Sequence, residues 1–74
     1  MLKFWDNIVM IGNNIKSLRI EKGISQKELA EKLNVSNKTI SHWESGYTEP
    51  PIAVITKLKK ILDVSYEELL EWQT

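Results

Sequence analysis

The sequence predicts an all-α fold of five short helices, and three observations lead to this prediction. Apolar residues recur at helical spacings of three and four along most of the chain. Residues that favour the starts and ends of helices separate these stretches. No run of alternating apolar and polar residues is long enough for a sheet. Because the chain has 74 residues, we expect one small domain at most.

The first two helices are predicted over residues 13–22 and 26–33. The first stops at Gly23, since glycine readily adopts the left-handed conformation found at helix C-termini. The segment from Ser25 to Glu28 has the S-x-x-E pattern of a capping box, which predicts the start of the second helix. That helix is expected to end near Asn34, another residue type that tolerates left-handed geometry.

The other three helices follow from the same kinds of signal. Ser36 is expected to cap a helix over residues 37–45 that Gly46 ends. Pro51 lies near the first position of a fourth helix, which places four apolar residues on one side: Ile52, Ile55, Leu58 and Leu62. After a break at Asp63, residues 65–68 repeat the capping-box pattern and predict a last short helix.

Residues 1–12 are predicted to form an apolar N-terminal arm ahead of a domain over residues 13–72. The arm is either a further turn of helix or an extended segment. Asp6 and Asn7 interrupt its apolar residues, so it lacks the length of a transmembrane helix and the continuous core of a signal peptide. We therefore expect a soluble cytoplasmic protein that does not contact the membrane.

The charges cancel overall but are unevenly distributed. All ten Lys and Arg side chains lie in residues 1–60 together with six acidic ones, whereas residues 61–74 carry four acidic side chains and no cation. This asymmetry is either functional or a matter of chance in a short chain. A neutral total is compatible with nucleic-acid binding, because the charge of one face decides such binding.

The residue types argue against an enzyme and against a metal or cofactor. The chain has no cysteine and one histidine, too few ligands for a tetrahedral metal site. It shows no nucleophile paired with a base and no glycine-rich phosphate loop, because its three glycines, at positions 12, 23 and 46, are all expected at turns. We expect no catalytic residue, no metal and no cofactor.

The most informative segment is the pair of short helices joined by residues 34–36. A turn of three or four residues between short helices is typical of a helix-turn-helix. Ala30 leaves room for the third helix to approach, and Ile40 and Trp43 are expected to pack beneath the second helix. The exposed side of the third helix then carries only polar or cationic residues: Asn37, Lys38, Ser41, His42 and Ser45.

The segment from Ser25 to Gly46, SQKELAEKLNVSNKTISHWESG, resembles the DNA-binding helix-turn-helix of the phage repressor/Cro-like family, also called the XRE family. The resemblance extends over roughly residues 13–71. It implies a lambda-repressor-like DNA-binding domain with the helix-turn-helix in its second and third helices. It also implies a transcriptional regulator, more often a repressor, with double-stranded DNA as its partner. Asn34 and Glu49 depart from the family pattern, where glycine and basic residues are usual.

The resemblance further implies roles for individual residues. The third helix is expected to enter the major groove, where four residues read bases: Asn37, Lys38, Ser41 and His42. Three residues are expected to bind DNA phosphates: Gln26, Ser36 and Thr39. Arg19 and Glu44 match a structural salt bridge of the family. Two alternatives stay open, because helix capping alone explains Gln26 and Ser36, and a lone surface histidine is usually only solvated.

Proteins of this family usually bind inverted-repeat operators as homodimers, with half-sites one helical turn apart. The resemblance therefore implies a homodimer here, and we expect apolar residues near the two ends to form its interface: Trp5, Leu69 and Trp72. Alternatively, the N-terminal arm covers the core of a monomer. A second function also remains open, in which the same fold acts as an antitoxin-like or adaptor module that binds a protein partner.

Overall fold

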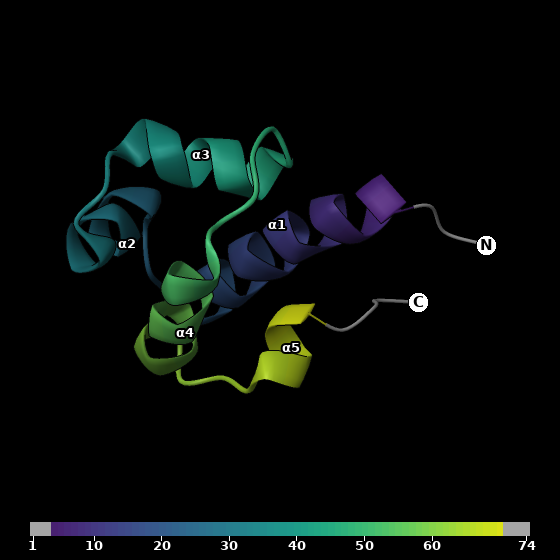
Figure 1. Ribbon diagram of the computed structural model, residues 1–74. Helices are drawn as coiled ribbons and strands as arrows, with labels where there is room; N and C mark the ends of the chain where they lie inside the picture. The colour runs from purple at the N-terminus through teal and green to yellow at the C-terminus, as the bar shows by residue number, and fades with distance from the viewer. Residues whose placement is uncertain (1–3, 71–74) are drawn as a thin grey trace.

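The computed structural model describes the backbone of residues 4–70 and the side chains of residues 11–70. Five helices span this part of the chain: α1 (Phe4–Glu21), α2 (Gln26–Leu33), α3 (Asn37–Ser45), α4 (Ile52–Ile61) and α5 (Tyr66–Leu70). No strand occurs among the described residues. The long helix α1 lies between α3 on one side and α4 and α5 on the other (Figure 1). The predicted all-α fold with five helices is thus confirmed.

The predicted helix starts follow from capping side chains. The Ser25 Oγ accepts a hydrogen bond from the Glu28 backbone N–H at 3.0 Å, while the Glu28 carboxylate accepts from the Ser25 N–H at 3.1 Å. Ser65 and Glu68 make the same reciprocal pair at the start of α5. Pro51 differs slightly from its predicted place, because it is the residue before α4 and not the first residue inside it.

The helix ends use residues that tolerate positive φ. Gly46 ends α3 with φ 82°, and Asn34 ends α2 with φ 58°. The Asn34 conformation explains how this chain dispenses with the usual glycine between α2 and α3, since Asn is among the few other residue types that adopt it. Asp63 makes the turn between α4 and α5 with φ 54°, at the predicted break.

Helix α1 begins at Phe4, well before the predicted start at residue 13. Residues 4–12 are therefore helical and not extended, and the predicted boundary between arm and domain falls inside one continuous helix.

The expectation that all three glycines lie at turns is wrong for Gly12. This residue is buried in the middle of α1, where an added Cβ would overlap the Trp43 carbonyl oxygen and lie 2.9 Å from that of Glu44. Its missing side chain lets α1 approach the last turn of α3.

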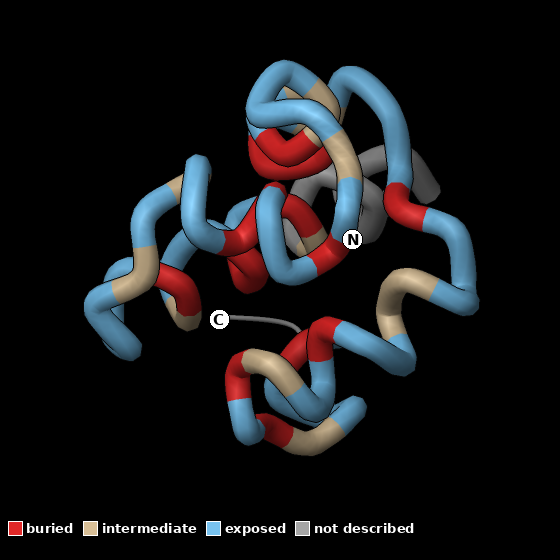
Figure 2. Tube along the Cα trace, turned by 90° about the vertical axis from the view of Figure 1, so that its left-hand side faces the viewer, coloured by how far each residue is buried: buried red, intermediate tan, exposed pale blue. Residues whose placement is uncertain are grey.

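The core forms where the helices meet, and Figure 2 shows the buried residues as short stretches separated by exposed ones. Its fully buried side chains come from all five helices and the turn after α4: Ile15, Leu29, Ile40, Leu58, Leu62 and Leu69. Trp43 is 6% exposed, as predicted from its position one turn after Ile40. Within the described residues, no helix has the length and apolar character needed to cross a bilayer.

Candidate nucleic-acid interface

Helices α2 and α3 pack together across a turn of three residues. Ala30 is 4% exposed, so a small side chain occupies the position where the two helices come close. The Val35 N–H donates to the Ala30 carbonyl oxygen at 3.0 Å, which fixes the chain direction after the left-handed Asn34. The geometry is that of a helix-turn-helix, with eight residues in α2 and nine in α3.

One side of α3 is buried and the other faces outward. Ile40, Trp43 and Glu44 lie on the buried side. The four residues predicted to read bases lie together on the other side, three of them exposed and His42 half-buried: Asn37, Lys38, Ser41 and His42. Because Glu44 is buried, this outward side carries no acidic group. It offers amide, ammonium, hydroxyl and imidazole groups, all of which donate hydrogen bonds.

Ser36 and Thr39, both predicted to bind phosphate, lie at the start of α3. The Ser36 Oγ accepts from the Thr39 N–H at 3.0 Å, so Ser36 caps the helix. The two hydroxyl oxygens lie 2.8 Å apart and share a hydrogen bond. Since that bond uses one of the two hydroxyl hydrogens, the other remains able to donate to an outside acceptor. Capping and phosphate binding are therefore compatible at this pair.

Arg19 and Glu44 form the expected ion pair between α1 and α3. The Arg19 Nε and Nη2 donate to the two Glu44 carboxylate oxygens at 2.6 and 3.1 Å. The two side chains are 10% and 3% exposed. The Arg19 Nη1 also donates to the Ile24 carbonyl oxygen at 2.9 Å, which ties down the turn before α2. This forked geometry suits a buried pair, because it satisfies both carboxylate oxygens.

Gln26 joins the same network. Its Nε2 donates to Glu44 Oε1 at 2.9 Å, which holds the side chain against α3. Gln26 is the first residue of α2, and Ser25 before it is the capping residue, so the alternative that Gln26 serves only as a cap is wrong. One of its two amide hydrogens is used by Glu44, and the second remains for another acceptor.

Tyr47 lies directly beside a predicted base-reading residue, and the sequence reasoning missed it. The left-handed Gly46 turns the chain back, so that the Tyr47 N–H donates to the His42 carbonyl oxygen at 3.0 Å. This turn brings the Tyr47 ring against the His42 imidazole. The signal was present in the sequence, since glycine at a helix end returns the next residue toward the last turn.

A polar hollow of about 250 Å³ opens where α1, α2 and α3 meet. Six residues line it: Asn13, Lys16, Gln26, Ser41, Glu44 and Ser45. Two of them, Gln26 and Ser41, were predicted to contact DNA. Lys16 was not singled out, although its position three residues before Arg19 places both on neighbouring parts of one side of α1.

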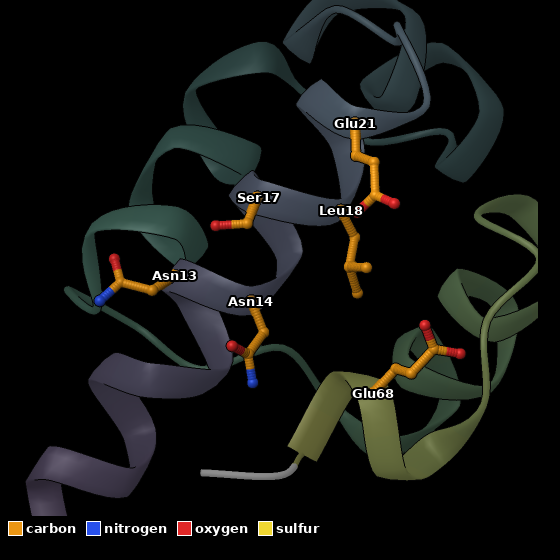
Figure 3. A pocket seen from close by; sticks show the side chains of 6 residues that line it. All are labelled: Asn13, Asn14, Ser17, Leu18, Glu21 and Glu68. Atoms are coloured by element: carbon orange, nitrogen blue, oxygen red, sulfur yellow. The ribbon is translucent and has the colours of Figure 1, made fainter. Parts of the chain in front are cut away.

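A second hollow, of about 460 Å³, lies between α1 and α5 (Figure 3). Asn14, Leu18 and Glu68 point into the space between the two helices, whereas Asn13 and Ser17 point toward the opposite side of α1. The Asn14 Nδ2 donates to the Leu69 carbonyl oxygen at 2.9 Å. This bond attaches α5 to α1 and thereby supports α1, on which α3 packs.

The comparisons with known proteins agree with this geometry. A family model described as helix-turn-helix matches residues 15–69, which includes α2, α3 and most of the rest of the chain. The chain belongs to this helix-turn-helix family. As predicted, it resembles the Cro/C1-type regulators within it.

Two solved helix-turn-helix structures are similar along nearly all of their own length. The crystal structure of the biofilm regulator SinR in complex with DNA is 43% identical, with a TM-score of 0.76, and the match covers 84% of this chain and 100% of that one. The restriction-modification controller protein C.AhdI from Aeromonas hydrophila is 30% identical, with a TM-score of 0.79, covering 86% of this chain and 97% of that one.

Among the curated relatives, the transcriptional regulator SinR of Bacillus subtilis is 44% identical over 63 residues. The match covers 84% of this chain and 57% of SinR. The chain spans about half the length of the first curated relatives it matches. The similarity to these helix-turn-helix regulators therefore concerns about half of each.

The residues predicted to form the dimer interface of this helix-turn-helix domain are only partly described. Trp72 and the side chain of Trp5 lie outside the described residues. Leu69 is 1% exposed and packs in the core, so it is not available to a second copy, and its proposed place in the interface is wrong. Its neighbour Leu70 is 47% exposed and presents the apolar surface of α5 instead.

Proposed function

We propose that this chain binds double-stranded DNA in a sequence-specific manner and regulates transcription as a repressor. The observation that carries this proposal is the outward side of α3, where four hydrogen-bonding residues gather without an acidic neighbour. An α-helix fits the major groove, and each base pair presents a distinct pattern of donors and acceptors there. A helix-turn-helix places its second helix in that groove.

Each residue on this side of α3 has a chemistry that suits base edges. The Asn37 amide both donates and accepts, as bidentate pairing with adenine requires. The Lys38 ammonium donates to guanine O6 and N7. Ser41 and His42 donate single hydrogen bonds, and the ring of His42 packs against the ring of Tyr47.

The phosphate contacts come from the edge of the same surface. Gln26 keeps one amide hydrogen, and the Ser36–Thr39 pair keeps one hydroxyl hydrogen, for DNA phosphate oxygens. Such contacts fix the orientation of α3 in the groove while the base contacts supply the sequence preference. SinR, which is 43% identical to this chain and whose crystal structure is a complex with DNA, supports DNA binding here.

The protein binds as a homodimer on an inverted repeat in this proposal. A single helix-turn-helix makes few contacts, and a two-fold dimer doubles them on half-sites whose centres lie about 34 Å apart. Occupation of such an operator blocks transcription without any cofactor. The exposed Leu70 of α5 supplies apolar surface for this dimer.

The test is selection from random double-stranded DNA by the purified chain at near-physiological salt, followed by sequencing of the bound fraction. We expect enrichment of an inverted repeat with half-sites one helical turn apart. Enrichment of a single half-site would contradict binding as a homodimer but would remain consistent with base reading by α3. If the chain binds DNA without enriching any sequence, and this binding disappears as the salt concentration rises, sequence-specific recognition is contradicted, since non-specific binding is electrostatic.

A further inference from the structure

The hollow between α1, α2 and α3 has the chemistry of an anion site. Its lining includes the Lys16 ammonium and the side-chain amides of Asn13 and Gln26, all of which donate hydrogen bonds. The single acidic residue that lines it, Glu44, is already neutralised. Both its oxygens accept from Arg19, one also accepts from Gln26, and the carboxylate side chain is 3% exposed. Lys16 therefore leaves the hollow with a net positive charge.

The hollow continues directly into the proposed DNA surface. Ser41, one of its lining residues, belongs to the outward side of α3, and Gln26 is one of the proposed phosphate contacts. When a helix lies in the major groove, the elements beside it face the sugar-phosphate backbone at the edge of that groove. A phosphate next to the bases read by α3 is thus the anion that this hollow would meet.

We propose that this hollow holds a phosphate of the DNA backbone, with Lys16 as its cation and Gln26 as its fixed hydrogen-bond donor. The inference rests on the proposed DNA binding and adds a contact from α1, outside the two helices of the helix-turn-helix. Lysine suits this task because its ammonium is a point charge on a flexible chain, which tolerates small differences in phosphate position. Lys16 contributes affinity here and no base preference.

The backbone that carries Lys16 is held firmly against α3. One turn before it, Gly12 allows α1 to approach the carbonyl oxygens of Trp43 and Glu44. Three residues after it, Arg19 makes the ion pair with Glu44. Because contacts on both sides of Lys16 fix α1 relative to α3, the hollow keeps its shape without a ligand, and the phosphate meets a preformed site.

The test compares Lys16→Gln with the matched control Lys60→Gln. Both residues are exposed and both substitutions remove one positive charge, but Lys60 belongs to α4, on the other side of α1 from α3 (Figure 1). Affinity for the selected DNA site is measured over a series of salt concentrations. Loss of one phosphate contact makes the slope of log K against log salt less negative by about 0.9. We expect this change for Lys16→Gln and an unchanged slope for Lys60→Gln.

Two further readouts make the result decisive. The base preference of Lys16→Gln should match that of the unaltered chain, since phosphate contacts carry no sequence information. Its thermal unfolding should also be unchanged, because Lys16 is exposed and is not part of the Arg19–Glu44 pair. Equal slopes for both variants, or a changed base preference, would overturn the assignment of Lys16 while DNA binding itself stands. Failure of the unaltered chain to bind DNA would overturn both proposals together.

Discussion

The imidazole of His42 packs against the ring of Tyr47, with the ring centres 4.7 Å apart and the planes inclined by 52°. The contact joins a residue on the proposed base-reading side of α3 to the turn that ends this helix. Aromatic pairs of this kind contribute about 0.5–1.5 kcal/mol beyond their buried area. Tyr47 is 76% exposed, so its own burial contributes little, and we expect its main effect to be on the position of the His42 ring.

Tyr47→Ala should therefore relax the base preference at the position that His42 contacts, while Tyr47→Phe should retain it. Loss of the ring frees the imidazole to rotate, whereas phenylalanine keeps the same contact without the hydroxyl. Repeating the DNA selection with both variants measures this directly. If Tyr47→Phe loses the preference as completely as Tyr47→Ala, the hydroxyl and not the ring contact matters.

Asn37→Ala and Lys38→Ala should each relax sequence preference at one base pair and weaken binding to the selected site. A good bidentate contact discriminates by about 1–3 kcal/mol, so the loss of affinity should be roughly 5- to 150-fold. Binding to an unrelated sequence should change far less for Asn37→Ala, because no charge is removed. Titration of each variant against the selected site and a scrambled site gives both numbers. Unchanged discrimination in both variants would remove Asn37 and Lys38 from the readout.

The Arg19–Glu44 pair should contribute strongly to the stability of the fold. Arg19→Met leaves the buried Glu44 carboxylate without its cation, which typically costs about 3–5 kcal/mol. We expect urea unfolding to show this loss. The double variant Arg19→Met with Glu44→Gln should be less destabilised than the sum of the two single variants, since it buries no unpaired charge. Additive effects would mean that the pair is not coupled.

The sequence predicted those parts of the fold that depend on local signals. Capping boxes at Ser25 and Ser65, and left-handed residues such as Asn34 and Gly46, act within a few residues of themselves, so the helix boundaries from α2 onward could be predicted closely. The start of α1 was misplaced because the apolar residues before residue 13 lack such a signal.

The remaining differences arise from tertiary packing. Leu69 and Leu70 are adjacent leucines with the same helix propensity, and only the position of α5 against α1 decides that the first is buried and the second exposed. Lys16 lines the proposed phosphate site because three helices meet beside it. Neither fact can be predicted from periodicity in a helix of five residues or from the spacing of one lysine.

Gly12 gives the sharpest test of the packing between α1 and α3. Alanine normally stabilises the interior of a helix relative to glycine by about 0.5–1 kcal/mol. At this position, however, the added methyl group would overlap the backbone oxygen of Trp43, which no side-chain rotation can move away. We therefore expect Gly12→Ala to destabilise the fold by about 1–3 kcal/mol or more, as overpacking does in other cores.

Ser17→Ala is the matched control, because Ser17 is exposed on the same helix and alanine there should be neutral or slightly stabilising. Urea unfolding of both variants gives the two free energies of unfolding. The overlap should also push the last turn of α3 outward. We therefore expect Gly12→Ala to weaken DNA binding even under conditions where the variant is fully folded. An unfolding free energy equal to that of Ser17→Ala would show that α1 and α3 do not approach each other at this residue.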